Sequence, residues 1–286
     1  MMHSILLFLS RFSVKLKIAF LILFLITGIV FWNLSYISTN YTLYENKMAV
    51  SESLEKARKI EKLITLLQDE RRAALKFLYV DQDVKAFEHA AEHTSMRLTQ
   101  IQDFMRQCKY DKKRQMLEKG FVKLISIRQE LLSGELSGID TIRFYSDRLI
   151  KHMIDVVALM VQQKNSDGFM AYFSIMNGVE YSALEADLMM AVMWEGLLTE
   201  ELFEVIVTMD GKAQSALDNF KRVSDASARD KLYTNYRSSY FVEINIQKDN
   251  FRNRLFRGEG DAFDLPVWSS STDASLQHLR GISSFE

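Results

Sequence analysis

No glycine or proline occurs between Gly28 and Gly120, and the whole chain of 286 residues contains a single proline, Pro266. A fold rich in β-strands needs turn residues at nearly every strand end, so an all-β or α/β chain could hardly contain such a stretch. Long helices, by contrast, keep both residue types out of their interiors. The sequence therefore predicts an all-α protein.

The N-terminal part of the chain predicts a membrane anchor. Residues 18–44 carry no charge, and their apolar core, residues 18–37, is long enough as a helix to cross the hydrocarbon of a bilayer. Residues 1–17 contain basic but no acidic side chains, which is typical of a cytoplasmic flank. We expect residues 1–17 in the cytoplasm, a transmembrane helix at 18–37 in the inner membrane, and the rest in the periplasm. The alternative is a cleaved signal peptide, but no small-residue cleavage site follows the apolar stretch.

The remaining chain predicts a helical domain over residues 45–280. Its apolar residues recur at helical spacing, and breaks between the repeats divide it into helices short enough to fold back on one another. We expect two antiparallel up-and-down four-helix bundles, formed by residues of about 45–165 and 166–280. Residues 281–286 then read as the truncated start of a stalk that leads to a missing second span.

Two details of the second bundle are specific enough to test. A helix is predicted to start at Thr199, with Glu200 and Glu201 in its first turn, and to continue past Phe220 through the tyrosine-rich residues 233–241. Pro266 is assigned to a loop, and the last helix is expected to be capped near Thr272.

Charge and cysteine content exclude several classes of function. Lys and Arg number 36 against 37 Asp and Glu, so there is no overall basic field to attract nucleic acid, and any anion site must be local. The one cysteine, Cys108, rules out an intramolecular disulfide and any cysteine-based zinc site, and its helical spacing places it in a core seam. We predict no nucleic-acid partner and no cofactor.

Arg71 is the residue that stands out on the first helix of the domain. It occupies the apolar stripe formed at three- and four-residue steps by Ile60, Ile64, Leu67, Arg71, Ala74 and Leu78. A guanidinium buried there needs an acceptor, which could be a protein carboxylate or a bound anion. Arg72 points about 100° further round the helix and is expected to face solvent.

Other chemistry-bearing residues favour ordinary structural roles. Arg128 competes with an apolar neighbour for a core seam, so we interpret it as a flank residue that extends its head to solvent. His89 and His93 have the spacing of metal ligands, but the apolar stripe of their helix lies on another face. We therefore predict no metal site. Because the sequence contains no phosphate-binding loop and no activated nucleophile, we also predict that the protein has no catalytic residues and is not an enzyme.

A resemblance to a known family begins at Arg71. The segment 67–71, Leu-Gln-Asp-Glu-Arg, is similar to the LQxER element that opens the nitrate- and nitrite-sensing (NIT) domain of bacterial signalling proteins. Further features are similar in order and spacing, namely Thr94, Arg128, Tyr145, Glu180, Trp268 and Thr272. The resemblance covers roughly residues 50–280. It implies an all-helical sensor, normally placed upstream of a kinase, chemotaxis or cyclic-dinucleotide output module.

The resemblance also implies a ligand site built from clustered arginines, to which Arg71 and Arg72 would belong. The family often has a second arginine element in the second half of the domain, and here Ala186 stands where that arginine would be. One reading is that Arg237 or Arg252 completes the site. A second reading is a domain that senses another ligand.

A third reading is structural, and in it Arg71 pairs with Glu185. Taken together, these observations predict a membrane-anchored, homodimeric sensor of a small anion, plausibly nitrate or nitrite, that transmits a helix displacement across the membrane. The alternative is a helical interaction or dimerisation domain of a membrane receptor that binds no ligand.

Overall fold

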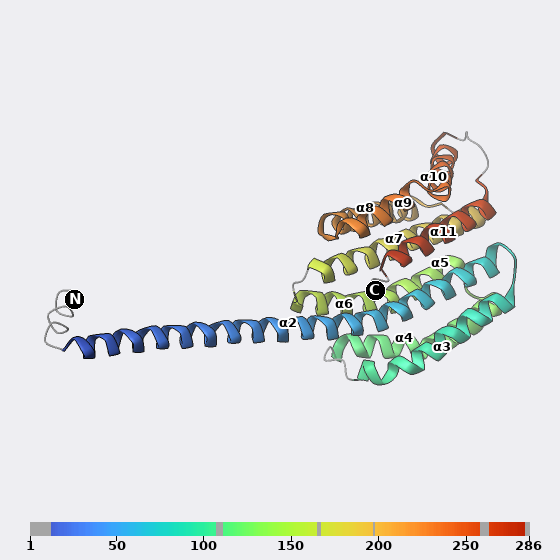
Figure 1. The fold of residues 1–286 in the computed structure, drawn as a ribbon. Coiled ribbons are helices and arrows are strands. Elements are labelled where there is room, and N and C mark those ends of the chain that lie inside the picture. Colours follow the sequence, from blue (N-terminus) through green and yellow to red (C-terminus); the bar gives the residue numbers. More distant parts are fainter. Residues whose placement is uncertain (1–12, 107–110, 165–166, 197, 258–262, 284–286) are drawn as a thin grey trace. The chain divides into compact units, whose positions relative to one another are not determined.

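The computed structural model describes residues 13–106, 111–164, 167–196, 198–257 and 263–283. These residues form helices joined by short connections and contain no strand, which confirms the all-α prediction (Figure 1). Cys108, predicted to lie in a core seam, falls outside the described residues. In chain order the helices are α2 (Val14–Tyr79), α3 (Val84–Arg106), α4 (Asp111–Leu132), α5 (Gly138–Arg143), the π-helical segment η1 (Phe144–Ile150), α6 (Lys151–Lys164), α7 (Asp167–Glu195), α8 (Glu200–Val223), α9 (Ala226–Tyr236), α10 (Ser239–Arg257) and α11 (Leu265–Ser283).

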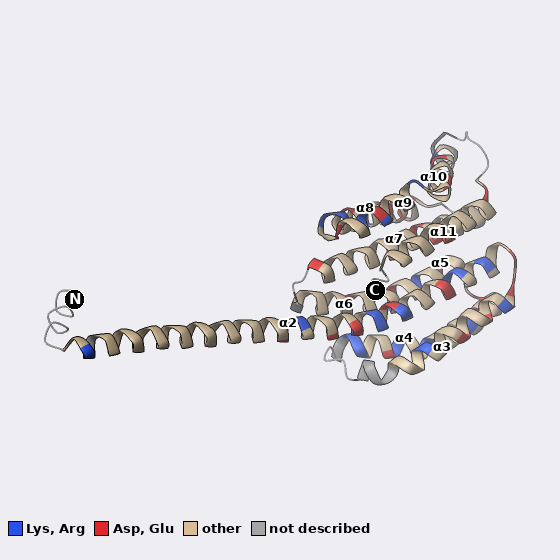
Figure 2. Ribbon diagram, viewed as in Figure 1, with Lys and Arg blue, Asp and Glu red and all other residues tan. Residues whose placement is uncertain are grey.

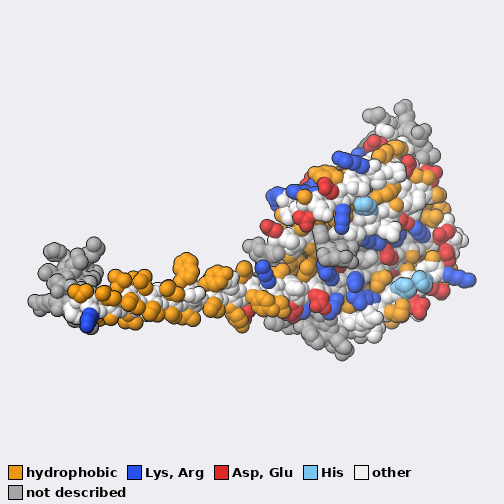
Figure 3. Space-filling view, in the orientation of Figure 1, with side chains coloured by type: hydrophobic (Ala, Val, Ile, Leu, Met, Phe, Trp, Pro, Cys, Tyr) orange, Lys and Arg blue, Asp and Glu red, His pale blue; other side chains and the backbone are white. Residues whose placement is uncertain are grey.

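The chain divides into two compact units, Met1–Glu52 and Ser53–Glu286. In the described part of the first unit, α2 carries the uncharged stretch, and its apolar side chains are exposed along their length (Figures 2 and 3). Within the described chain, α2 is the one helix long and apolar enough to cross a membrane. This is the helix in which the sequence places the span.

The second unit is organised around α7, which contributes to each of its three large apolar clusters. In the first cluster, the N-terminal part of α7 packs with α2, α3, α4, η1 and α6. The second joins the C-terminal part of α7 to the end of α2 and to α5, α8, α10 and α11. The third places the middle of α7 against α8, α9 and α11. A helix shared in this way is buried on most sides, which explains why α7 has few charged residues. The division of residues 45–280 into two bundle halves remains a prediction.

The region predicted as one helix from Thr199 through residues 233–241 is instead three helices, so this prediction was wrong. Thr199 does cap α8, as expected. The helix then ends at Val223, and Asp225 starts α9 by accepting a hydrogen bond from the Ala228 amide at 2.8 Å. The polar residues of this region therefore act as helix caps, although neither glycine nor proline marks the break.

The last helix begins earlier than predicted. α11 starts at Leu265, with Pro266 in its first turn, where a missing amide hydrogen removes no helix hydrogen bond. The Asp264 side chain caps this helix by accepting from the Val267 amide at 3.0 Å. Thr272 is consequently an interior residue of α11, and its hydroxyl donates to the Trp268 carbonyl oxygen at 2.8 Å.

A π-helical segment lies between α5 and α6. In η1, Phe144–Ile150, the wider helical turn follows directly on α5 and leads into α6 without a break. Tyr145 and Ser146 lie at its start, and both side chains are buried. π-turns inside helices are frequent at functional sites, and this one faces the most heavily charged part of α2.

Candidate functional site

Three consecutive charged residues of α2, Glu70, Arg71 and Arg72, are buried inside the second unit. Glu70 and Arg71 are fully buried, and Arg72 is 8% exposed. Because neighbouring residues of a helix point about 100° apart, the three side chains reach different neighbouring helices. Each must therefore find its own polar partners in the interior.

Arg71 is held by two carboxylates of α7. Its Nε donates to Asp187 Oδ2 at 2.7 Å, and its Nη1 donates to Glu180 Oε1 at 2.9 Å and to Ser146 Oγ at 2.7 Å. The buried ion pair considered from the sequence is thus present, but its partners are Glu180 and Asp187. The proposed pairing with Glu185 was wrong, because that carboxylate contacts Lys248 on α10 at 2.6 Å.

One nitrogen of Arg71 has no protein acceptor. Nη2 is fully buried and makes no hydrogen bond with the described residues. Burial opposes the charge of this guanidinium, but Glu180 and Asp187 outweigh the desolvation and raise its pKa above the usual value. Arg71 is therefore a buried cation whose Nη2 group donates no hydrogen bond to any described residue.

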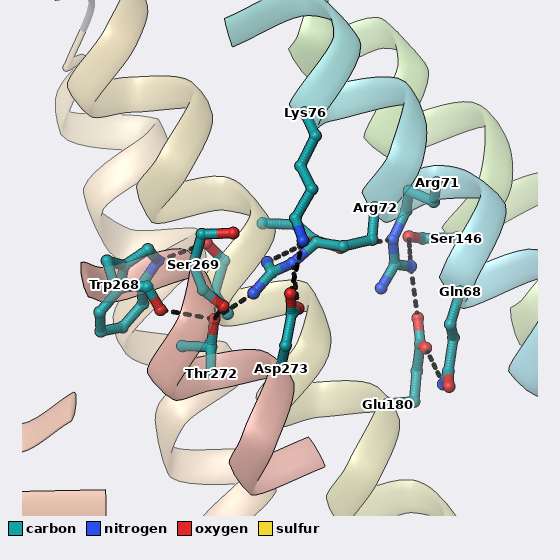
Figure 4. A network of polar contacts seen from close by, with 12 residues as sticks. Gln68, Arg71, Arg72, Lys76, Ser146, Glu180, Trp268, Ser269, Thr272 and Asp273 are labelled. Atoms are coloured by element: carbon teal, nitrogen blue, oxygen red, sulfur yellow. Dashed lines mark hydrogen bonds and ion pairs between the residues drawn. The ribbon is translucent and has the colours of Figure 1, made fainter. Parts of the chain in front are cut away.

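Arg72 also lies in the interior, so the prediction that it faces solvent was wrong. Its Nη1 donates to Asp187 Oδ1, its Nη2 to the hydroxyl of Thr272, and its Nε to Asp273 Oδ1 at 3.0 Å. Figure 4 shows this side chain extending from α2 towards α11, away from the side on which Arg71 meets Ser146. The carboxylate of Asp187 thus bridges the two arginines.

A pocket of about 450 Å³ lies beside Arg72. Its walls include the Asp187 carboxylate and, towards solvent, two ion pairs: Lys76 with Asp273 at 2.6 Å and Arg280 with Asp69 at 2.7 Å. Arg71 does not line this pocket. A solute inside this pocket can therefore reach Arg72 and Asp187.

The start of α11 is fastened to α7 by Trp268. This indole is buried, and its Nε1 donates to the Ala186 carbonyl oxygen at 3.1 Å. Thr272, one turn further along α11, receives the hydrogen bond from Arg72 (Figure 4). Contacts with Arg72 and contacts with the α7 backbone therefore lie on neighbouring turns of α11.

Glu70 forms a second network on the other side of α2. It accepts from Arg128 Nε at 2.7 Å and Nη2 at 2.8 Å, and from the Tyr145 hydroxyl at 2.5 Å. Arg128 also donates to Ser95 Oγ at 2.8 Å, and its side chain is 16% exposed. Arg128 was predicted to extend to solvent, and this was wrong because the Glu70 carboxylate holds it in the interior. Burial and the neighbouring Glu70 raise the pKa of Tyr145 well above its usual value.

The structure does not bring the other two candidate arginines to this site. Arg237 is an exposed residue at the C-terminus of α9. Arg252 is half exposed on α10, where it lies 3.6 Å from Asp210 and 3.8 Å from Asp249. No hydrogen bond or ion pair connects either residue with Arg71 or Arg72 in the described chain.

Comparison with known proteins places this arrangement in a family. The family model described as nitrate and nitrite sensing (NIT) matches residues 62–284, which is more than half of the chain. The chain belongs to the NIT family. This match confirms the resemblance noted in the sequence. The matched residues include the part of α2 that carries Arg71 and the whole of α11.

One solved structure, titled as that of the NasR transcription antiterminator, has the same fold as this NIT domain. The two superpose with a TM-score of 0.70 at 17% sequence identity, over 90% of this chain and 71% of that one. At this identity the likeness shows the fold alone. A search of curated proteins gives no match.

Five of the six further features that resemble the NIT family belong to the two networks of α2, and the sixth, Thr94, contacts α2 one turn earlier. Arg128 and Tyr145 contact Glu70, and the Thr94 hydroxyl donates to the Leu66 carbonyl oxygen of α2 at 3.3 Å. The others, Glu180, Trp268 and Thr272, belong to the network of the two arginines. Features that are weak one by one in the sequence are thus brought together around two successive turns of one helix.

Two carboxylate partners of the arginines were not found from the sequence. Asp187 follows Glu180 by seven residues, so both lie on one face of α7, and this spacing was an available signal. Asp273 gave no such signal, because α11 was expected to begin near it. In the described chain, no three histidine, cysteine or carboxylate side chains are grouped so that they could hold a metal ion.

Proposed function

We propose that this protein is a membrane-anchored sensor whose NIT domain binds nitrate or nitrite beside Arg71 and Arg72. In this proposal residues 18–37 span the inner membrane, the N-terminus is cytoplasmic and the domain is periplasmic. The domain consists of two antiparallel helical bundles, binds its ligand without catalysis and acts as a homodimer of a receptor such as a chemoreceptor or kinase. Membership of the nitrate- and nitrite-sensing family supports the ligand class.

The observation that carries the proposal is the unused Nη2 group of Arg71. A buried donor without an acceptor costs about 1–3 kcal/mol, and the cost is greater on a charged group. An oxyanion that entered from the pocket beside Arg72 would bring oxygen atoms to two adjacent guanidinium groups, and planar oxyanions suit their fork-shaped donors.

Transmission would use α2 itself. This helix contains both the candidate span and the two arginines, from Val14 to Tyr79 without interruption. A change in the contacts of Arg71 and Arg72 therefore acts directly on the helix that enters the membrane. A differential binding energy of a few kcal/mol between two positions of α2 is sufficient to shift their populations.

The direct test is calorimetric titration of the full-length protein in detergent with nitrate, nitrite, chloride and sulfate. The variants are Arg71→Lys, which keeps a positive charge but loses the fork of donors, and Arg252→Ala as a control for an exposed arginine. We expect nitrate or nitrite to bind to the wild type and to the control, and much more weakly to Arg71→Lys. Absence of binding to the folded wild type would contradict the proposal.

A second function is favoured by one observation, namely that both arginines already have carboxylate partners. In a purely structural network of this kind, the domain would serve to pair with a partner or with a second copy. Sedimentation of the full-length protein separates the two proposals. Anion-independent dimerisation, together with no anion binding, would favour the interaction domain.

A further inference from the structure

We infer that Asp187 is a built-in competitor of the ligand, whose carboxylate occupies the place between Arg71 and Arg72 that a bound oxyanion would take. This inference rests on the proposed function and deepens it. It identifies the residue that sets the affinity of the site, and it narrows the ligand to planar anions that have the shape of a carboxylate.

The geometry of the bridge is the first argument. One oxygen of Asp187 accepts from Arg71 Nε at 2.7 Å and the other accepts from Arg72 Nη1, so the two oxygens serve two different guanidinium groups. The Asp187 side chain is 2% exposed. A planar anion with two or three oxygens on one central atom, such as nitrite, nitrate or formate, offers the same pair of acceptors.

The charge of the site is the second argument. Arg71 and Arg72 are faced by three carboxylates, those of Glu180, Asp187 and Asp273, and Lys76 shares the last of these. The positive charge is therefore already matched by the protein. An additional anion in this low-dielectric interior would meet repulsion unless one of the carboxylates left its position.

Asp187 is the carboxylate that a ligand at the two arginines could replace without leaving any other protein group unpaired. Glu180 also accepts from Gln68 Nε2 at 2.6 Å, and Asp273 also holds the ammonium group of Lys76. The hydrogen bonds of Asp187, by contrast, come from the two arginines alone in the described structure. If the ligand replaced Asp187, both guanidinium groups would keep an acceptor.

The pocket gives the exchange a route. Asp187 and Arg72 both line the pocket of about 450 Å³, whereas Arg71 lies behind them. An anion arriving from solvent thus meets the carboxylate that it must displace. Once displaced, this carboxylate can turn into the pocket, which is lined by Lys76 and Arg280 together with their carboxylate partners Asp273 and Asp69. The affinity for the ligand then depends on the difference between two binding free energies at the same donors, that of the ligand and that of the Asp187 carboxylate.

Neutralising Asp187 tests this competition, and Asp69 supplies the matched control. Asp187→Asn keeps the shape of the side chain but removes its charge, whereas Asp69→Asn removes one charge from the rim of the same pocket without touching either arginine. Nitrate, formate and chloride are titrated calorimetrically into full-length protein in detergent, at constant ionic strength. We expect nitrate and formate to bind at least about tenfold more tightly to Asp187→Asn than to the wild type, and Asp69→Asn to change binding by less than about threefold. Chloride should gain little, since a single sphere cannot bridge the two guanidinium groups.

The outcomes separate this inference from the proposed function. If the wild type binds nitrate but Asp187→Asn binds it no more tightly, the inference fails and the function stands. If Asp187→Asn binds nitrate and the wild type does not, the inference stands and nitrate sensing by the natural chain fails. If neither protein binds an anion, both fail.

A second variant tests the inference if Asp187→Asn does not fold in the absence of ligand. Asp187→Ala opens the bridging position, so added nitrate or formate should restore the missing acceptor, as measured by thermal unfolding. The unfolding temperature is expected to rise with nitrate or formate more in this variant than in the wild type, and not with chloride. An equal rise with all three salts would overturn the inference, because it would report ionic strength alone.

Discussion

Glu70 holds Arg128 in a two-pronged ion pair, with Nε at 2.7 Å from one carboxylate oxygen and Nη2 at 2.8 Å from the other. Glu70 is fully buried, and it lies next to Arg71 in the chain. The pair therefore joins α4 to α2 in the turn of α2 that also carries the candidate ligand site.

Removing Arg128 should destabilise the domain. Arg128→Ala leaves the Glu70 carboxylate buried without its cation, and we expect the free energy of unfolding to fall by about 3 kcal/mol. Urea unfolding of the full-length protein in detergent measures this change. The control is Lys59→Ala, which removes an exposed ion pair with Glu55 and should change stability by less than about 0.5 kcal/mol. A comparable loss in both variants would contradict the structural role of Arg128.

The hydroxyl of Tyr145 contributes to the same network in a smaller way. Tyr145→Phe removes one of the donors to Glu70 but leaves the ring in the core, so we expect a loss of about 1–2 kcal/mol in unfolding free energy. Tyr233→Phe, at an exposed tyrosine, is the matched control and should be neutral. If Tyr145→Phe were also neutral, the hydroxyl would be replaceable by water.

The stability of the domain should depend on pH through Glu185. Burial raises the pKa of Glu185 to about 7 from an ordinary value of 4.5, although the ion pair with Lys248 opposes this rise. The folded protein thus binds the proton more tightly than the unfolded chain does. The contribution of Glu185 is fully present below pH 4.5 and is lost as the pH rises through about 7.

Glu185→Gln should remove this dependence. We expect the stability of the variant, relative to the wild type, to increase from about pH 5 to about pH 8 in urea unfolding series. The other charged groups around Glu185 are Lys248, Asp210 and Arg252, and they remain in the variant. Parallel pH curves for the two proteins would show that Glu185 is ionised over the whole range.

Trp268 should report on ligand binding. Its buried indole contacts the backbone of α7, and Thr272 on the next turn holds Arg72, so a change at Arg72 alters the surroundings of the ring. In a Trp32→Phe, Trp194→Phe protein, we expect nitrate to shift the remaining tryptophan emission. The same protein with Thr272→Val loses the hydrogen bond to Arg72 and should show a smaller shift. An equal shift in both would place the change elsewhere.

The position of Arg71 could be predicted because it depends on local periodicity. The apolar stripe of α2 contains Arg71, and a stripe is buried whichever helix covers it. The burial of Arg72 could not be inferred in this way. It follows from the packing of α7 and α11 on the adjacent face, and a helix pattern does not reveal how many neighbours a helix has.

The partners of the arginines were harder to predict than the arginines themselves. Glu185 was one partner considered from the sequence, but it lies five residues after Glu180 and two before Asp187, so it points to another side of α7, where it meets Lys248. Glu180 and Asp187 share the correct face. At α11, Pro266 was taken for a loop residue, although proline is also well suited to the first turn of a helix, and this error concealed Asp273.

The order of charges at Glu70, Arg71 and Arg72, one negative followed by two positive, restricts how this part of α2 can move. If it turned by one residue in one direction, Glu70 would face the carboxylates Glu180 and Asp187. If it turned in the other direction, Arg71 would face Arg128. Either rotation would bring charges of the same sign together in the interior. The three residues therefore resist rotation of the helix about its axis. The motion left to α2 is a slide or a tilt. If α2 spans the membrane as proposed, its membrane end would therefore be pushed or pulled rather than twisted.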